Sequence, residues 1–302
     1  MKTKHFFKIL SLFLIISVNV NGQDLLKQLQ KELPNTYHKT IGTFKSTRIG
    51  LGHSVETRKK GALQLSLYNR YWNKPTATSQ RFLADEVTTR YGLDYAFTDK
   101  FTAGIGYTNF DKITDGFLKY NLFQQTKGIK KMPISITLVQ TFSHISLINA
   151  NNDNFYDSNA SEKYGFASQL LIARKINRLF SLQIAPTLVY RTETSVASND
   201  PGTHFALVFA GRHKIGKHTS IVSEYGYVAN PIKSVDTFNT FMAGINWEIG
   251  DIMAQFHVTN ARNYAEDVFL TQTANNFNFK DPNLHFGVNV TYILHTKKNK
   301  VK

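Results

Sequence analysis

The stretch Phe180-Ser-Leu-Gln-Ile-Ala-Pro-Thr-Leu-Val-Tyr190 decides the fold class of this chain. Successive side chains of a β-strand point to opposite faces of a sheet, so every second residue shares a face. One face of this stretch is apolar and consists of Phe180, Leu182, Ile184, Leu188 and Tyr190. The other face consists of Ser181, Gln183, Ala185, Thr187 and then Arg191. The alternation predicts a strand in a sheet with one apolar and one polar surface.

The same alternation recurs along the rest of the chain. Twelve candidate strands occupy residues 62–73, 86–98, 101–110, 116–125, 133–146, 163–175, 179–191, 203–212, 219–229, 238–249, 252–260 and 283–295. The eighth and the eleventh alternate poorly, and the other ten keep one apolar face. A repeat of this kind predicts an all-β fold.

The connections between these strands alternate in length. Those after the second, fourth, sixth, eighth and tenth strands are short, whereas those after the first, fifth, seventh and eleventh are longer and polar. Those after the third and the ninth strands are intermediate. A bacterial membrane barrel with both termini inside has short periplasmic turns, longer external loops and an even strand count. We therefore predict a transmembrane antiparallel up-and-down β-barrel of about twelve strands.

The apolar face is predicted to meet lipid. A barrel of this width is too wide for its own side chains to fill, and the polar face carries full charges among glycines. The aromatic residues Phe97, Phe101, Phe180 and Trp247 lie beside the short turns, where an interfacial girdle is expected. The alternative is a soluble sandwich or barrel that turns the same face inward, with these aromatics as ordinary strand residues.

The N-terminus predicts export. Residues 1–22 combine Lys2, Lys4 and Lys8 with an apolar run of about ten residues, which is typical of a cleaved signal peptide and too short for a membrane helix. We therefore predict location in the outer membrane, with lipid as a partner and nucleic acid excluded as one. The chain has 302 residues, a formal net charge of +15 and no cysteine, so no disulfide supports the fold. The predicted domains are a signal peptide (1–22), an N-terminal helix with a polar segment (23–60) and the barrel (61–302).

Residues 36–60 are polar and basic, and have too few alternating apolar residues for a lipid-facing strand. They contain the candidate plug residues Lys45, Arg48, His53, Glu56 and Arg58. One interpretation is a plug or constriction lying in the lumen, where its charges meet inward carboxylates of the wall. The other is a periplasmic lead-in with solvated charges, and the sequence leaves both open.

The polar face supplies the candidate residues that line the lumen, namely Arg70, Arg90, Asp94, Lys119, Arg191, Glu224, Glu248 and His285. Charged rings in a pore tune its selectivity, so the cationic members are candidates for attracting anions. The alternative is that they form structural ion pairs with Asp94, Glu224 and Glu248.

Several motifs resemble an uncharacterised family of exported outer-membrane β-barrel proteins in Bacteroidetes, domain of unknown function 5777. They are TFKSTRIGLGHSVET at residues 43–57, KKGALQL at 59–65, RYGLDYAFTDKFTAGIG at 90–106, DGFLKY at 115–120 and PISIT at 133–137. The resemblance implies the fold and the location and supplies no activity.

The predicted function is a narrow pore for small solutes, with anions as the candidate class. The first alternative is a plugged barrel that anchors envelope proteins through its loops at residues 147–162 and 261–282. A lipid hydrolase is a minor alternative. Ser143-His144, and His257 with Thr259 and Asn260, are its only candidate residues, and no nucleophile elbow accompanies them. Residues 151–157 offer oxygen ligands without the order of a calcium loop. We therefore predict no enzyme activity, no cofactor and no metal.

Overall fold

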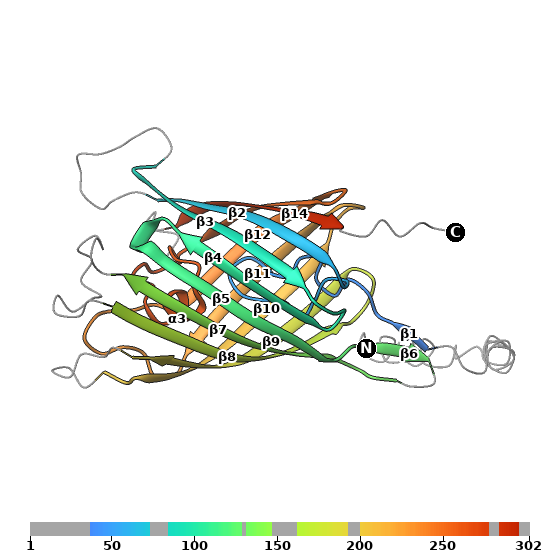
Figure 1. The fold of residues 1–302 in the computed structure, drawn as a ribbon, viewed down its shortest axis with the longest axis horizontal. Helices are drawn as coiled ribbons and strands as arrows, with labels where there is room; N and C mark the ends of the chain where they lie inside the picture. The colour runs from blue at the N-terminus through green and yellow to red at the C-terminus, as the bar shows by residue number, and fades with distance from the viewer. Residues whose placement is uncertain are drawn as a thin grey trace, which may run out of the picture.

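The wall of the molecule is one closed antiparallel sheet, as the computed structural model in Figure 1 shows. The structure describes residues 37–72, 84–128, 131–146, 162–192, 200–277 and 284–295. Within these ranges, twelve strands form the barrel: β2 (Ala62–Trp72), β3 (Glu86–Ala96), β4 (Phe101–Thr108), β5 (Ile113–Phe123), β7 (Ser135–Ser146), β8 (Glu162–Lys175), β9 (Phe180–Arg191), β10 (Thr203–Lys214), β11 (Thr219–Val228), β12 (Thr240–Ile249), β13 (Ile252–Thr259) and β14 (His285–His295). Each strand pairs with the next along the chain, and β14 pairs with β2 to close the barrel.

The predicted fold class and strand count are confirmed. Every predicted strand is present, with ends that differ by three residues at most. The eighth and eleventh candidates correspond to β10 and β13, and their alternation is weak for a structural reason that is clearest in β10. Its inward residues include Ala206, Val208 and Ala210, and these are apolar because they pack on apolar side chains inside the barrel.

The apolar face of the sheet points outward. In β9, Leu182, Ile184 and Leu188 each expose at least 40% of their surface, whereas the alternate residues Gln183 and Ala185 are buried. The same division holds around the wall. The apolar exterior and closed ladder remove the alternative of an open sheet or a two-layered sandwich, since only a closed sheet leaves no unpaired edge in hydrocarbon.

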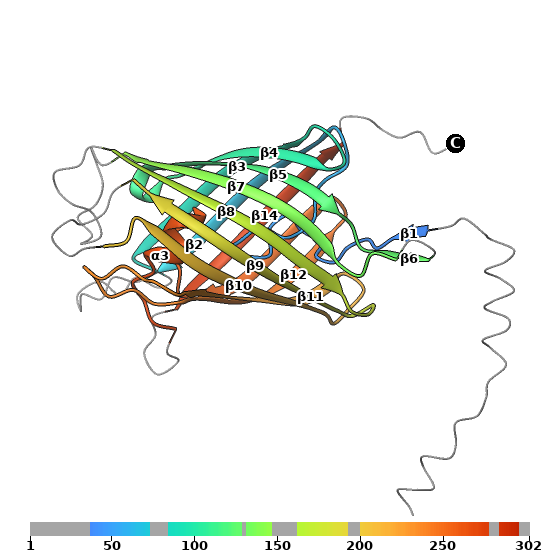
Figure 2. The same cartoon turned by 90° about the horizontal axis from the view of Figure 1, so that it is seen from below.

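Smaller elements lie at the two ends of the barrel. Strands β1 (Tyr37–Lys39) and β6 (Thr126–Gly128) form a two-stranded sheet that projects from the end with the short turns (Figure 2). The helix α3 (Glu266–Thr271) lies inside the opposite end, where the long connections are, and a 3-10 turn η1 (Phe110–Lys112) joins β4 to β5. No helix in the described ranges is long and apolar enough to cross a membrane. The predicted signal peptide and the predicted helix at residues 24–33 lie outside the described residues.

The interior of the barrel is a packed core. Apolar side chains from residues 40–60 and from α3 form one cluster with inward residues of the wall. The inserted members of this cluster are Phe44, Ile49, Leu51, Val55, Phe269 and Leu270. A twelve-strand barrel leaves more space than its own side chains can fill, and these two inserted segments occupy it.

Candidate functional site in the barrel lumen

Residues 40–60, which we call the lumen segment, enter and leave the barrel through the same mouth. At the start, Thr40 N donates to Gln125 O at 2.7 Å, in the short connection that follows β5. At the end, Lys60 N donates to Asp99 Oδ1 at 2.9 Å, in the short turn between β3 and β4. The lumen segment is therefore a re-entrant loop, attached at both ends on the side of the short turns.

The tip of the lumen segment is a small hairpin held by its own backbone. Ser54 N donates to Thr47 O, and Ile49 N donates to Gly52 O, both at 2.9 Å. Further back, the carboxylate of Glu56 accepts the Thr43 N–H at 2.7 Å and joins the two arms. These contacts give the loop a defined shape without any ladder bond to the wall.

Inward polar side chains from seven strands contact this hairpin, and all of them except Gln64, which bonds to the Thr47 hydroxyl, reach its backbone. Glu224 on β11 accepts the N–H groups of Leu51 and Gly52 at 2.5 and 3.1 Å. On the other side of the barrel, Lys119 Nζ on β5 donates to Thr47 O at 2.9 Å. The remaining contacts come from Gln64 on β2, Thr137 on β7, Gln183 on β9, Gln255 on β13 and Asn289 on β14. The loop is therefore surrounded by the wall and lies in the lumen.

The hairpin approaches the wall closely at Gly50. A Cβ atom on Gly50 would lie 1.8 Å from Cε and 2.9 Å from Sδ of Met242, an inward residue of β12. Any larger residue at position 50 forces Met242 or the tip to move.

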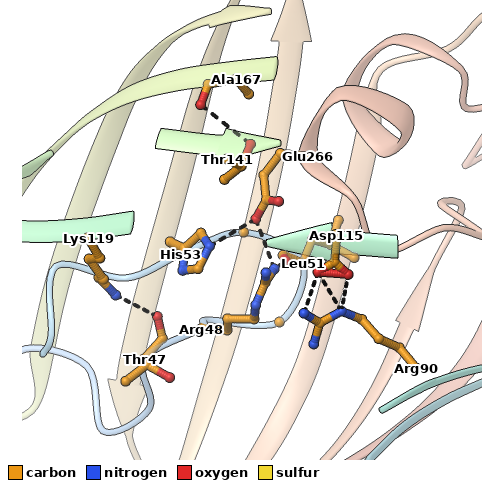
Figure 3. Close-up of polar contacts among 12 residues, drawn as sticks. Thr47, Arg48, Leu51, His53, Arg90, Asp115, Lys119, Thr141, Ala167 and Glu266 are labelled. Carbon is orange, nitrogen blue, oxygen red and sulfur yellow. Dashed lines mark hydrogen bonds and ion pairs between the residues drawn. The ribbon is translucent and has the colours of Figure 1, made fainter. Parts of the chain in front are cut away.

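A buried charge cluster joins the lumen segment to α3, as Figure 3 shows. Arg48 Nη1 lies 2.9 Å from Glu266 Oε1 and donates to Leu51 O at 3.1 Å. His53 Nε2 lies 3.3 Å from the same oxygen of Glu266. These three side chains link the loop that enters from one mouth to the helix inserted from the other.

The pKa values of His53 and Glu266 in this cluster are shifted from their usual values. Burial holds the pKa of the His53 imidazole well below its usual value, and the positive charges of Arg48, Lys119 and Arg90 lower it further. Burial also raises the pKa of the Glu266 carboxyl, and the charge of Arg48 opposes that rise. His53 is therefore neutral, and its contact with Glu266 is not a full ion pair.

The first part of the segment after β13 folds into the lumen, which corrects the prediction of an external binding loop at residues 261–282 for its residues 261–273. Arg70 on β2 donates to the carbonyls of Ala261 and Asn263, and its guanidinium lies 3.9 Å from the ring centre of Tyr264. Ser143 on β7 donates to Asp267 Oδ2 at 2.8 Å. These wall contacts bury residues 264–271, so this part of the loop presents no outer surface. Most of the other predicted loop, residues 147–161, lies outside the described ranges.

Arg90 and Asp94, two predicted lumen residues on β3, bind different partners and do not pair with each other. Arg90 pairs with Asp115 on β5 rather than with Asp94, through contacts of 2.7 and 2.5 Å that pass over Gly106 on β4. A Cβ at Gly106 would lie 2.2 Å from Arg90 Nη2, so glycine is required there. Asp94 instead accepts a hydrogen bond from Gln64 Nε2 at 2.8 Å.

The other predicted site residues lie near the two mouths. Glu248 is 3.0 Å from Lys45 and 3.8 Å from Arg212 at the mouth with the short turns. Arg58 Nε also lies towards this mouth and donates to Gln64 Oε1 at 3.0 Å. At the far end, His285 contacts Asn275 Nδ2 at 3.0 Å, and Arg191 lines a hollow with Asp267.

Sequence reasoning missed Asp115 and Glu266, which pair with the buried arginines Arg90 and Arg48. The strand containing Asp115 begins at Ile113, three residues before its predicted start, so the inward position of Asp115 was not recognised. Alternation extended back from Lys119 through Phe117 would have found it. Glu266 lies in a connection, where no periodic pattern indicates which way a side chain points.

The candidate catalytic residues do not form a nucleophile–base pair in the described part of the chain. Ser143 points inward to Asp267, whereas His144 belongs to the opposite face and packs on Tyr164 with ring centres 4.9 Å apart. His257 is buried in the lumen, and neither of its ring nitrogens has a hydrogen-bond partner. The described residues contain no group of three side chains placed to hold a metal ion, and the candidate calcium loop lies outside them.

Two hollows lie beside α3 among the described residues, and their volumes are about 40 and 10 Å³. A single water needs roughly 10–15 Å³ on this measure, so these two hollows hold at most a few waters. The described part of the inserted segments therefore packs closely against the wall around α3.

Three solved structures are similar to this chain at low sequence identity. The KdgM porin, 10% identical, gives a TM-score of 0.45 over 78% of this chain and 99% of its own. The NanC porin, 8% identical, gives 0.46 over 77% and 100%. An outer membrane channel from Pseudomonas putida F1, 11% identical, gives 0.46 over 80% and 98%. No curated protein matches the chain.

The family is decided by a sequence model that covers residues 44–294, described as a membrane bound beta barrel domain. The match includes most of the lumen segment as well as nearly the whole wall. The even strand count, closed ladder and apolar exterior are those of the outer-membrane type of barrel, and the protein is located in the outer membrane. The predicted origin in Bacteroidetes stays a prediction. The chain belongs to the family of membrane-bound β-barrel domains called domain of unknown function 5777.

Proposed function

We propose that the protein is an outer-membrane channel for small solutes, and that the lumen segment is its plug. The observation that carries the proposal is the re-entrant path of residues 40–60. Both ends are fixed at one mouth, and no strand of the wall includes the tip. The tip can therefore move without breaking a ladder bond of the barrel.

The interior is divided into two sides, and this division supports a route for the solute. Inward apolar residues are concentrated on β7 to β12, where the apolar side chains of the lumen segment pack. Inward charges are concentrated on β2, β3 and β5, where the plug makes polar contacts only through Gln64 and Lys119. Water can replace polar contacts at small net free-energy change, so we place the passage along the charged side.

The charges on that side favour anions. Arg70 and Lys119 donate to backbone carbonyls, and no carboxylate in the described part of the chain contacts either group. Arg90 is matched by Asp115. A displaced plug and α3 segment would leave the charges of Arg70 and Lys119 facing the passage, and uncompensated cations attract anionic solutes.

Conductance across planar bilayers tests the proposal. The reference is a shortened chain that starts at residue 36, which retains the lumen segment. The first test chain starts at residue 61, and the second also has residues 262–276 replaced by a short glycine and serine linker. We expect rare openings in the reference, frequent openings in the first test chain, and a larger, anion-selective conductance in the second.

The outcomes separate the candidate functions. A second test chain that folds in the membrane and stays electrically silent would contradict the channel and favour the structural anchor. Catalysis is not part of the proposal, because the serine and histidine candidates do not meet in the described residues. Hydrolysis of a phospholipid by the purified reference chain would overturn that part of the reasoning.

A further inference from the structure

The outer face of β7, β8 and β9 contains a groove with a volume of about 590 Å³. Its walls are apolar side chains that point into the membrane, including Leu118, Leu138, Leu188 and Phe205. This volume lies within the range of sites that bind small organic ligands. Because the groove opens toward hydrocarbon, only a molecule in the lipid phase can reach it.

The backbone ladder is interrupted beneath this groove. Strands β8 and β9 pair from Gly165 opposite Arg191 to Lys175 opposite Ser181 in one register. Two pairs are missing from the middle of this ladder, namely Leu170 opposite Pro186 and Leu171 opposite Ala185. Proline has no N–H group, so the carbonyl of Leu170 receives no donor from β9. Pro186 is the seventh of the twelve residues of β9, so the interruption lies near the middle of the membrane.

An unpaired carbonyl at this depth is unfavourable. In the hydrocarbon core no water is available, and each unsatisfied backbone group costs several kcal/mol. Proline is therefore confined to edges and bulges in most sheets, whereas here it occupies an interior strand of a closed barrel. A ligand that donates a hydrogen bond to Leu170 O removes this penalty.

Two polar side chains point into the same groove. Gln140 on β7 and Ser168 on β8 are paired across the strands and exposed on the outer face. Ser168 Oγ donates to Gln140 Oε1 at 2.5 Å, and Gln140 Nε2 donates to Thr141 O at 3.0 Å. The serine oxygen still has a lone pair to accept a hydrogen bond, so the groove offers acceptors at Ser168 and at the neighbouring residue Leu170.

A second outer groove provides an internal comparison. It has a volume of about 610 Å³ and lies over β2, β3, β4 and β5, with Leu93, Ile105 and Tyr107 among its lining residues. The ladders β2–β3, β3–β4 and β4–β5 are continuous through it. Volume and apolar lining are therefore common to both grooves, and the broken ladder is particular to the first.

We propose that the groove over Pro186 binds a long acyl chain that carries a hydroxyl group near its middle. The chain lies along the apolar walls. Its hydroxyl donates its one proton to the Leu170 carbonyl, and its oxygen accepts from the Ser168 hydroxyl once that group turns away from Gln140 Oε1. Because Pro186 lies near the middle of the membrane, only a hydroxyl near the middle of the acyl chain reaches Leu170. A hydroxyl next to the headgroup stays at the membrane interface. The inference does not depend on the channel function.

Native mass spectrometry of the purified full chain in detergent tests this inference. The probes are 12-hydroxyoctadecanoic acid, 2-hydroxyoctadecanoic acid and octadecanoic acid, added together in equal amounts. We expect the first to be retained about tenfold more than the other two, which corresponds to one satisfied hydrogen bond of about 1.4 kcal/mol. Pro186→Val restores the ladder donor and should abolish this preference while leaving the barrel folded. Leu93→Ala, in the second groove, should leave the preference unchanged.

Three outcomes would overturn the inference. The first is equal retention of all three acids by the unmodified chain. The second is a preference that survives Pro186→Val. The third is occupation by a second copy of the chain. Since the protein has no cysteine, Leu188→Cys supplies a single thiol, and rapid disulfide dimerisation in lipid nanodiscs that hydroxylated acid fails to block would assign the groove to a protein contact.

Discussion

Replacing Arg48 with methionine should release the plug. The substitution keeps an unbranched apolar stem and removes the guanidinium group that faces Glu266 Oε1 at 2.9 Å. Both side chains are almost completely buried, so Glu266 is left without its main partner. Removing one member of a buried pair costs about 3–5 kcal/mol. The lower figure applies here, because Glu266 already has a raised pKa and can take up a proton once Arg48 is gone.

A change of about 3 kcal/mol alters the ratio of displaced to inserted plug on the order of 100-fold. Single-channel recording measures this ratio as the fraction of time spent open. The double variant Arg48→Met with Glu266→Gln removes both charges and should return the open fraction to within about threefold of the unmodified protein, because replacing both partners is nearly neutral. Lys45→Met is the matched control, since Lys45 pairs with Glu248 at a solvent-exposed mouth and such pairs contribute about 0–1 kcal/mol.

Two results would refute this reasoning. One is an Arg48→Met protein that folds in the membrane and opens no more often than the unmodified protein. The other is a double variant that stays as open as the single one, because the loss would then come from packing and not from the uncompensated carboxylate.

Three further perturbations give separate predictions. Gly50→Val should displace the tip of the plug by overpacking, at about 1–3 kcal/mol, and adding Met242→Ala should recover most of the loss of closed time in the same recordings. The inserted plug holds the pKa of His53 below its usual value of about 6.5, so this side chain favours the inserted state above that pH and opposes it as the pH falls. The open fraction should therefore rise by up to about tenfold for each pH unit below about 6.5. His53→Gln should flatten that profile. Ile184→Arg, at mid-depth on the lipid face, should lower the unfolding free energy in lipid vesicles by about 2–4 kcal/mol, whereas Phe180→Arg at the interface should lower it by about 0–1 kcal/mol; equal effects would place that face away from lipid.

The wall of the barrel could be predicted from the sequence because its signal is repeated. Each strand has period-2 alternation, and errors in one strand are corrected by its neighbours. The direction of the apolar face was correct for the same reason, since Leu182 and Ile184 share it with their counterparts in every clear strand. Even β10, whose inward face is apolar and whose alternation is poor, lies where it was predicted.

The contacts inside the barrel could not be predicted in the same way. Arg90 reaches Asp115 across an intervening strand, and it can do so only because Gly106 lies beneath it. Sequence alternation shows which side chains point inward. It does not show which residues of different strands lie at the same height in the barrel. The lumen segment was harder still, because Glu224 holds it through the backbone amides of Leu51 and Gly52. Amides are present in every residue, so such a contact leaves no sequence pattern.

The two sides of the interior decide how far the plug can move. Full withdrawal would expose four side chains that are now at most 2% exposed, namely Phe44, Ile49, Leu51 and Val55. Burying such a side chain contributes about 1.5–3 kcal/mol, so their exposure together would cost on the order of 6–12 kcal/mol. Each polar contact on the charged side contributes only about 0.5–1.5 kcal/mol net, because water replaces it. A plug that stays against the apolar wall and gives up its contacts with Lys119, Gln64 and Glu266 therefore moves at lower free energy than one that leaves the barrel, because only the second also exposes the four apolar side chains.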